Sequence, residues 1–531
     1  MTSNLPWLLT LGPLLLAAVA LTPRGITTPR RLAAFGFAAA LVTVALAAGA
    51  GVSVAVWGAL ATPTIGLAGG GLGLRVDALS ATMFMLVAFV GAAVIGYSRN
   101  YLDGDPNHAS FLKRLCLTVA CVLMLAVSGN LVQLIVAWIA TSVGLNALLT
   151  FYAERRPAQL AARKKFVISR MGDACLIAAS ILLWSTFGAF DFQTIFAGAK
   201  TIAAGSGATG AIQAAALLIA AAALLKSAQF PLHGWILEVM ETPTPVSALL
   251  HAGIINAGGF LVLRLSDIMV MSTPALDMLA VFGGVTALFG SLAMLSQTSV
   301  KVGLAYSTIA QMGFMLLQCG LGAFSAALLH IVAHSLYKAH AFLSSGGVID
   351  LLRASWSPSP GGQPHPARMA IAVTIVLGLA LAFSWLFGAT PMEKPGVFAL
   401  GAVMLMGLTI LLANAIDERP NGYVVGRAVL TAGVVACLYF ALQRGAEYLL
   451  HDALPPTLAL RGPFDLAIVV CVVAAFALIA VLQGEFARQA ARPFWQAAYV
   501  HMWNGLYVNT LANRMALKLW PAARSGKQGS V

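Results

Sequence analysis

Apolar runs of roughly 20 residues recur along almost the whole chain, and their spacing limits the possible folds more than any other feature. Hydrophobic residues make up 60% of the 531 residues and charged residues only 9%, whereas about a quarter of an ordinary soluble domain is charged. The runs lack the alternating pattern of barrel strands, and a segment in lipid must satisfy its own backbone hydrogen bonds. We therefore predict an all-α polytopic membrane protein that contacts the lipid bilayer.

The runs predict about fifteen transmembrane helices, and no connection between them is long enough for a soluble domain of useful size. The first run has no convincing cleavage site, so we expect it to be retained as an anchor. The predicted helices lie near residues 5–22, 32–57, 76–97, 115–128, 131–152, 166–187, 211–234, 245–265, 274–296, 302–320, 323–346, 368–388, 396–415, 424–442 and 464–484.

The formal net charge of +13 is gathered in particular loops rather than along one continuous surface. This distribution argues against nucleic acid as a partner and indicates membrane topology, because cytoplasmic loops are rich in Lys and Arg. Basic residues follow predicted helices 1, 3 and 5 and fill the carboxy-terminal tail, so we predict an inner or plasma membrane protein with its amino terminus outside and its carboxy terminus in the cytoplasm. These residues are Arg24, Arg30, Arg31, Arg99, Lys113, Arg114, Arg155, Arg156, Arg163, Lys164, Lys165, Arg488, Arg492, Arg514, Lys518, Arg524 and Lys527.

Six cysteines are scattered through apolar segments without a C-x-x-C pair. Free cysteine in such a setting is usually a small buried hydrophobe. We therefore predict no disulfide framework, no metal site and no cofactor in this chain.

A lysine inside an apolar segment is the first candidate functional residue. Lys226 ends the apolar run 211–225 and precedes Pro231 in the stretch Leu-Leu-Lys-Ser-Ala-Gln-Phe-Pro. A lysine near the bilayer centre costs about 2.5 to 3.5 kcal/mol even on lenient insertion scales, so chains keep one mainly where it does electrical work. Pro231 lacks a backbone donor, so the helix should break after Lys226, and broken helices line cavities. The plainer alternative is a lysine that snorkels to the membrane surface.

Three further titratable residues follow one another at intervals of four. His330, His334 and Lys338 therefore form one slowly drifting stripe about 12 Å long on a helix. Such a stripe inside a membrane predicts proton transfer through interposed water. A histidine-rich metal site is the competing idea, but the same helix has no obvious carboxylate to complete it. His251, which alone would suit a buried core histidine, joins the predicted proton path because imidazole relays protons near neutral pH.

Two charged residues near helix ends each keep two interpretations. Asp173 follows Arg170 by three residues, so the two can form a local ion pair. Alternatively, Asp173 faces Lys226 across the bundle and favours the charged amine. Lys301, at the start of predicted helix 10, is either an interfacial lysine or a cytoplasmic point of proton uptake.

Residues 226–264, 301–311 and 330–349 resemble the proton-pumping antiporter-type membrane subunits shared by respiratory complex I and multisubunit cation/proton antiporters. The resemblance covers about residues 75–350 and implies two inverted five-helix repeats, each with a broken helix. It also implies that Lys226 is the central proton-binding residue and that His251 connects two half-channels. The second half-channel would hold His330, His334 and Lys338.

The resemblance implies five parts of the chain. They are residues 1–112 with helices 1–3, residues 113–268 as the first repeat, residues 269–418 as the second repeat, residues 419–485 with the last helices, and residues 486–531 as a cytoplasmic tail that docks a partner.

Two departures from the family pattern affect the mechanism. The family has a Trp-Glu pair on helix 5 whose glutamate partners the lysine of helix 7, whereas this chain has Trp138-Ile139, and Asp173 is the nearest substitute. No lysine falls inside helix 12 or within the apolar body of helix 13, where pumping members carry a charged exit residue. Only Glu393 and Lys394 lie near. Both departures argue against pumping by the complex I scheme but not against passive proton conduction.

The tail alternates aromatic and polar residues, which favours an amphipathic helix at the membrane surface or against a partner. Residues 499–508, of the type Tyr-Val-His-x-x-Asn-Gly-Leu-Tyr-Val, resemble the membrane subunit of DAB-type inorganic carbon accumulation complexes. This resemblance implies a large cytoplasmic zinc-binding partner, similar to β-carbonic anhydrases, that turns CO2 into bicarbonate. The membrane subunit would couple that reaction to the ion gradient.

Our leading hypothesis is a proton-conducting, non-enzymatic subunit of an energy-coupled CO2 hydration complex, with a path through Lys226, His251, Lys301, His330, His334, Lys338 and Asp173. The first alternative is a pumping subunit of an NADH-quinone oxidoreductase or a cation/proton antiporter. The second is a scaffold that conducts nothing. Sodium in place of protons also stays open, because a broken helix offers carbonyl oxygens to Na⁺.

Overall fold

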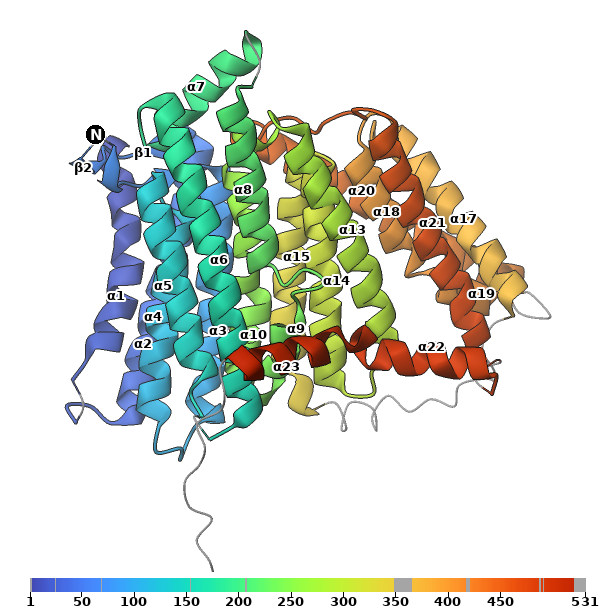
Figure 1. The fold of residues 1–531 in the computed structure, drawn as a ribbon, viewed down its shortest axis with the longest axis horizontal. Coiled ribbons are helices and arrows are strands. Elements are labelled where there is room, and N and C mark those ends of the chain that lie inside the picture. Colours follow the sequence, from blue (N-terminus) through green and yellow to red (C-terminus); the bar gives the residue numbers. More distant parts are fainter. Residues whose placement is uncertain are drawn as a thin grey trace, which may run out of the picture.

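The computed structural model describes residues 2–23, 25–67, 69–152, 154–205, 208–347, 365–416, 421–486, 489 and 491–519. In this part of the chain, long helices stand side by side in one bundle (Figure 1). The prediction of an all-α polytopic membrane protein is confirmed. Arg24, Arg488, Arg524 and Lys527 of the predicted cytoplasmic charges lie outside the described residues.

The chain enters the bundle with helices that flank two short two-stranded sheets at one end. The first helices are η1 (Thr2–Thr10), α1 (Leu11–Leu21), α2 (Pro29–Trp57) and α3 (Ala78–Tyr101). Between α2 and α3, β1 (Leu60–Ala61) pairs with β4 (Arg75–Val76) and β2 (Ile65–Leu67) pairs with β3 (Gly70–Leu72), both antiparallel.

The next helices include those that hold Lys226. They are α4 (His108–Ala126), α5 (Leu131–Leu149), α6 (Arg156–Phe187), α7 (Phe192–Ala204), α8 (Gly210–Lys226), α9 (Gly234–Glu238), η2 (Val239–Glu241), α10 (Thr244–Ala252), η3 (Ile254–Asn256), α11 (Ala257–Arg264) and α12 (Ser266–Met269).

The remaining helices complete the bundle and then cross its lower end, as Figure 1 is oriented. They are α13 (Thr273–Leu295), α14 (Val300–Gly320), α15 (Phe324–Leu343), η4 (Ser345–Gly347), α17 (Pro366–Leu386), α18 (Pro395–Met406), α19 (Thr409–Ala415), α20 (Gly422–Leu450), α21 (Pro463–Phe486), α22 (Pro493–Trp503), η5 (Gly505–Tyr507) and α23 (Val508–Leu519).

Twelve helices in the described residues are long and apolar enough to cross a membrane, or thirteen if α18 and α19, which meet at a 44° bend, form one span. The expected count of about fifteen is not confirmed. Two expected segments account for the difference between fifteen and thirteen. Helix α8 has only 17 residues and stops at Lys226, and α15 carries three histidines and a lysine within 20 residues.

Local sequence explains where several helices begin. The side chains of Asp77, Asn130 and Thr209 each accept a hydrogen bond from a backbone N–H in the first turn of α3, α5 and α8. These caps satisfy donors that have no partner inside the helix.

The break after Lys226 lies where Pro231 predicts it. Helix α8 ends at Lys226, and α9 begins only at Gly234. A second interruption separates α10 from α11 at Gly253. Two chain breaks therefore lie close to the predicted path residues Lys226 and His251.

Helices α13 and α14 pack backbone to backbone through small residues. An added Cβ at Gly313 would lie 2.5 Å from the backbone nitrogen of Ala287, and one at Gly283 would lie 2.5 Å from that of Leu317. Only glycine allows this approach. The contact fixes α14, which carries Thr308 toward α10.

Lys164 and Lys165 lie in α6 rather than in the predicted cytoplasmic loop. Helix α6 already begins at Arg156, and the two lysines are only 8% and 4% exposed. The loop prediction was wrong for them because a proline in the first turn starts the helix well before the apolar run does.

Candidate functional site

Lys226 lies in a buried pocket between α8 and α5. Its ammonium Nζ donates to Ser142 Oγ at 2.6 Å and to the carbonyl oxygen of Trp138 at 3.4 Å. The same Nζ lies 4.2 Å from the centroid of the Trp138 ring, which places the cation against the aromatic face. The side chain is 7% exposed and points inward, so the snorkelling alternative is wrong.

Asp173 is separated from Lys226 by the indole of Trp138. Trp138 Nε1 donates to Asp173 Oδ1 at 2.9 Å, and Arg170 Nη2 lies 2.7 Å from Asp173 Oδ2. The local ion pair predicted with Arg170 is present. No direct ion pair joins Asp173 to Lys226 among the described residues. The indole of Trp138 contacts both groups, the carboxylate through Nε1 and the amine through the ring face.

Lys165 is a site residue that the sequence analysis missed. Its Nζ donates to the carbonyl oxygen of Ser142 at 2.9 Å, so Lys165 and Lys226 share one serine. A cavity of about 10 Å³, at the lower limit for one water molecule, is lined by both lysines and by Ser169 and Trp235. Two neighbouring ammonium groups repel each other. The pair of lysines therefore binds a first proton more tightly than a second.

A signal for Lys165 was present in the sequence. Lys165, Ser169 and Asp173 are spaced by four residues, the same interval that reveals the stripe on α15. The strongly basic segment directed the interpretation toward topology instead.

A second group of contacts joins α10, α14 and α15. Thr308 Oγ1 donates to the carbonyl oxygen of Leu304 at 3.0 Å and lies 3.0 Å from His251 Nδ1. Because the hydroxyl has one proton and gives it to Leu304, the hydrogen-bond pattern assigns the imidazole proton to Nδ1. Lys338 Nζ donates to the same carbonyl at 3.0 Å. His251, Thr308 and Lys338 therefore meet at one turn of α14.

The histidines of α15 continue from this point. His334 Nε2 donates to the carbonyl oxygen of His251 at 3.2 Å, and the ring centroids of His330 and His334 are 6.2 Å apart. His330 Nδ1 lies 3.1 Å from Gln318 Oε1. The structure thus brings together four predicted residues, namely His251, His330, His334 and Lys338.

Lys301 lies apart from both groups. Its Nζ donates to Thr244 Oγ1 at 3.3 Å, at the lower end of the bundle where α10 begins. The side chain is half-buried. Because Thr244 and His251 share α10, Lys301 is placed at one end of the helix that carries His251, and both interpretations of Lys301 remain.

The two groups meet at the interruption of α10. The small cavity beside Lys165 and Lys226 is also lined by Leu250 and Ile254, which flank His251 in the chain. His251 Nε2 is buried and has no hydrogen-bond partner in the described residues. One water-sized space therefore separates the lysines from the backbone around His251.

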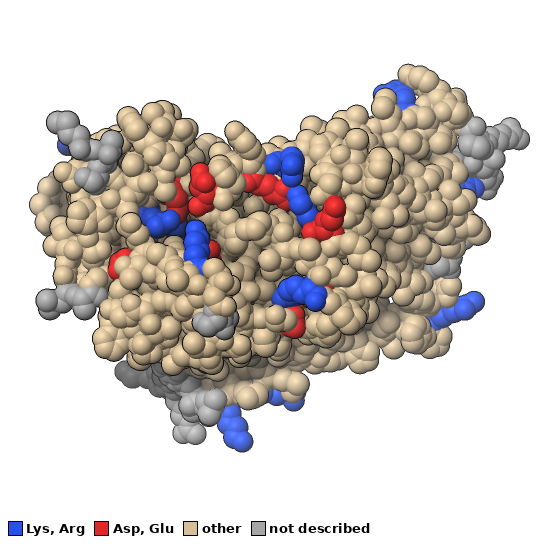
Figure 2. All heavy atoms as spheres, turned by 90° about the horizontal axis from the view of Figure 1, so that it is seen from above, with Lys and Arg blue, Asp and Glu red and all other residues tan. Residues whose placement is uncertain are grey.

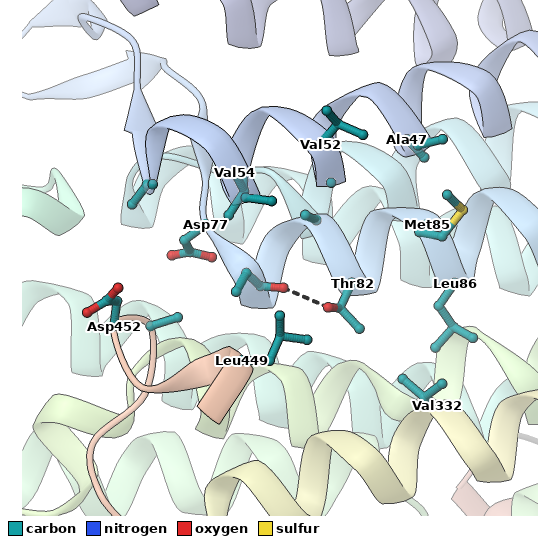
Figure 3. A pocket seen from close by; sticks show the side chains of 18 of the residues that line it. Ala47, Val52, Val54, Asp77, Thr82, Met85, Leu86, Val332, Leu449 and Asp452 are labelled. Carbon is teal, nitrogen blue, oxygen red and sulfur yellow. Dashed lines mark hydrogen bonds between the residues drawn. The ribbon is translucent and has the colours of Figure 1, made fainter. Parts of the chain in front are cut away.

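A larger cavity of about 660 Å³ lies on the other side of α15 (Figure 3). Its walls are mostly apolar and include Val332 and Leu336 of α15, with Asp77 and Asp452 toward one end. Residues two positions apart on a helix point to opposite sides, so Val332 faces away from His330 and His334. No predicted path residue lines this cavity, and we do not place the site there.

Metal ligands are not grouped in the described part of the chain. No three His, Cys, Asp or Glu side chains lie close enough there to hold a metal ion. The chemistry that this arrangement offers is proton transfer between amines, imidazoles and hydroxyls.

Comparison with known families gives two matches. Residues 128–355 match a family described as NADH:quinone oxidoreductase/Mrp antiporter, TM, and residues 69–112 match NADH-Ubiquinone oxidoreductase (complex I), chain 5 N-terminus.

The chain is 37% identical to the probable inorganic carbon transporter subunit DabB2 of Halothiobacillus neapolitanus over 85% of this chain and 81% of that protein. It is 33% identical to DabB of Hydrogenovibrio crunogenus over 84% and 83%.

More distant relatives match part of the sequence or the fold. NADH-quinone oxidoreductase subunit L of Mycobacterium tuberculosis is 34% identical over 68% of this chain and 55% of that protein. The solved Mrp complex from Dietzia sp. DQ12-45-1b matches in fold with a TM-score of 0.63 at 23% identity, over 99% of this chain and 61% of that one. These matches confirm both resemblances found in the sequence.

Proposed function

The chain belongs to the antiporter-like membrane subunits shared by NADH:quinone oxidoreductase and Mrp antiporters, and we propose that it conducts protons for an energy-coupled inorganic carbon accumulation complex. The observation that carries the proposal is the shared serine of Lys165 and Lys226, joined by one small cavity to the backbone of His251. Similarity to two proteins named as probable inorganic carbon transporter subunits supports the choice of complex.

In the proposed path, protons move inward from the histidines of α15 to the lysines of α8 and α6. His330 and His334 pass the proton to His251, whose free Nε2 accepts it. A water in the cavity beside Leu250 then carries it to Lys226, and Ser142 holds Lys226 and Lys165 close enough for the next transfer. Thr308 holds the His251 imidazole in place, Lys338 exchanges protons beside it at the Leu304 carbonyl, and Lys301 serves as a cytoplasmic exchange point.

Asp173 has an electrostatic role in this proposal. Its carboxylate is held by Arg170 and by the indole of Trp138, and it lies behind the ring that carries the Lys226 cation. The glutamate expected at Ile139 is absent. Asp173 lies farther from Lys226 than a direct ion-pair partner would, so its carboxylate attracts the Lys226 ammonium more weakly. A weakly held proton suits conduction better than storage.

The orientation and the assembly are part of the proposal. The amino terminus lies outside and the carboxy terminus inside the inner membrane, and residues 113–268 and 269–418 form inverted repeats with breaks at α8–α9 and at α18–α19. Helices α22 and α23 form an amphipathic segment that docks a cytoplasmic zinc protein. Phe494, Tyr499 and Trp503 on this segment are 72%, 50% and 49% exposed.

Purification and a flux measurement test this function together. The complex purified through the full-length chain is expected to contain a large soluble zinc protein, detected by mass spectrometry and metal analysis. In proteoliposomes with an internal pH-sensitive dye, Lys226→Ala should lower proton influx at least tenfold. Lys200→Ala, the same change on an exposed lysine of α7, is the matched control.

Two outcomes would contradict the proposal. Full flux and carbon uptake in an assembled Lys226→Ala variant would indicate a scaffold. A quinone-linked assembly, or flux that stops when Na⁺ is replaced by choline, would favour the pumping or antiporter alternative, which the similarity to subunit L keeps in view.

A further inference from the structure

A cavity of about 820 Å³ lies between two groups of helices in the second half of the bundle. Helices α13, α14 and α15 form one wall, and α18, α20 and α21 form the other. His330 and His334 line it from α15, and Gln443 lines it from α20. Most of the other lining residues are apolar, and the remaining polar ones are Ser291, Gln311, Tyr337, Tyr439 and Gln483.

Several buried polar atoms beside this cavity have no partner in the described residues. They are His330 Nε2 and both polar atoms of the Gln443 amide, on side chains of residues that are 8% and 2% exposed. An unpaired buried donor or acceptor carries the full cost of its desolvation. Water removes that cost where the space is large enough, and one water takes about 30 Å³. The cavity therefore has both the room and the polar partners for water.

An ion pair lies one helical turn beyond Gln443. Glu447 follows Gln443 by four residues on α20, so the two side chains lie on the same face. Glu447 Oε2 accepts from Lys394 Nζ at 2.6 Å, and Glu447 Oε1 accepts from Thr457 at 3.0 Å. Both side chains of the pair are 16% exposed.

This pair lies at the end of the bundle opposite α22 and α23, where α18 begins and α20 ends. Seen from that end, all of the visible acidic and several of the basic side chains gather around a hollow near the middle of the surface, and further basic side chains lie toward its edges (Figure 2). Arg444 also approaches Glu447 at 3.4 Å, from a largely exposed position. The pair thus lies partly exposed at that end of the bundle, one helical turn from Gln443 on the same helix.

We propose that Glu447 and Lys394 form the outer mouth of the proton path, and that water between Gln443 and His330 carries protons from this mouth to α15. This inference rests on the proposed function. It gives Lys394 and Glu447 the place of the charged exit residue that helices 12 and 13 do not supply. Glu447 exchanges a proton with outside water, the water at Gln443 relays it, and His330 Nε2 accepts it.

A flux measurement tests the route on the full-length chain in its purified complex. In proteoliposomes with an internal pH-sensitive dye, Gln443→Leu and Glu447→Gln are each expected to lower proton influx about tenfold. Glu447→Asp should retain most of the flux because it keeps a carboxylate. Glu393→Gln is the matched control and should leave the flux unchanged. It neutralises a carboxylate next to Lys394 in the sequence, but this carboxylate accepts a hydrogen bond from Thr390.

Chemical labelling tests the water directly and does not depend on conduction. A charged methanethiosulfonate reagent reacts only with a thiol in water, so Gln443→Cys should be modified. Leu430→Cys, on the same helix and 67% exposed on the free chain, should stay unmodified in the bilayer. Modification is read as a mass shift on the peptide, with the unsubstituted chain as the background for its own cysteines.

The outcomes separate this inference from the proposed function. Loss of flux in Lys226→Ala with full flux in Gln443→Leu and Glu447→Gln would keep the function and overturn the outer mouth. An unreactive thiol in Gln443→Cys would overturn the water-filled cavity. Full flux in Lys226→Ala would overturn the proposed function and this inference with it.

Discussion

Lys165 and Lys226 donate hydrogen bonds to opposite parts of the same residue, the first to the Ser142 carbonyl at 2.9 Å and the second to the Ser142 hydroxyl at 2.6 Å. One lysine comes from α6 and the other from the broken end of α8. Ser142 therefore fixes the distance between two amines that compete for protons in a buried site. This relationship makes the serine a sensitive position to test.

Ser142→Ala should lower proton influx several-fold without changing assembly. The substitution removes the hydroxyl partner of Lys226 and keeps the carbonyl partner of Lys165, and a hydrogen bond to a charged group is worth about 1.5–3 kcal/mol. Ser142→Thr retains a hydroxyl and should retain most of the flux. Vesicle influx with a pH-sensitive dye checks both, and equal flux in Ser142→Ala and the unsubstituted chain would show that the hydroxyl is not used.

Lys165→Met should reduce influx as strongly as a change at Lys226. Methionine keeps an unbranched apolar side chain of similar length, so packing is preserved while the second amine is lost. Lys113→Met, on a partly buried lysine of α4 that donates to the carbonyl of Thr22, is the matched control. If Lys165→Met conducts normally, protons pass Lys226 without using the second lysine.

Asp173→Asn should reduce flux more than it reduces stability. The amide oxygen still accepts from Trp138 Nε1, but the charge that faces Arg170 and the Lys226 side of the ring is removed. Because Arg170 is 37% exposed, water compensates much of the lost ion pair, and we expect a stability loss of only about 1 kcal/mol. Thermal unfolding in detergent and influx in vesicles measure the two effects. A large fall in unfolding temperature with normal flux would assign Asp173 a purely structural role.

The tail helix is held by a buried charge network. Lys164 Nζ donates to Glu238 Oε1 at 2.8 Å and to Asn509 Oδ1 at 2.7 Å, and Asn513 Nδ2 donates to Glu238 Oε1 at 2.7 Å. Glu238→Gln leaves Lys164 without its counter-charge, and breaking such a pair costs about 3–5 kcal/mol when both partners are buried.

We therefore expect Glu238→Gln to release α23 from the lower face of the bundle. Limited proteolysis should cut the tail faster, and the cytoplasmic partner should be recovered in smaller amounts. Glu393→Gln neutralises an exposed carboxylate and serves as control. An unchanged cleavage rate would show that apolar contacts of α22 and α23 suffice to hold the tail.

Packing of α13 against α14 gives a prediction that concerns stability alone. An added Cβ at Gly313 meets the backbone of α13, so Gly313→Ala should destabilise by about 1–3 kcal/mol. Gly303 lies in the same helix with open space around it, and Gly303→Ala should be neutral or stabilising by up to about 1 kcal/mol. Thermal unfolding of the two variants checks this, and equal effects would contradict the close approach.

Intervals along single helices predicted part of the site. The spacing of His330, His334 and Lys338 by four residues follows from helix geometry, and Pro231 marks the break after Lys226 because it removes a donor. Lys165 was missed because its segment fits two predictions. The basic residues indicate a cytoplasmic loop, whereas the four-residue spacing of Lys165, Ser169 and Asp173 indicates one face of a helix. Gln443 and Glu447 had no signal, since their importance depends on which helix faces α15.

The sequence by itself determined that the chain is a helical membrane protein, which of its titratable residues lie inside apolar segments, and to which family it belongs. These properties depend on composition and on neighbours a few positions apart, where lipid and helix geometry leave few options. Only the tertiary structure decided that Lys165 and Lys226 meet at Ser142, that the Trp138 ring separates Lys226 from Asp173, and that Lys338, Thr308 and His251 meet on α14. Such meetings join residues up to 88 positions apart, and the packing of helices against one another sets them.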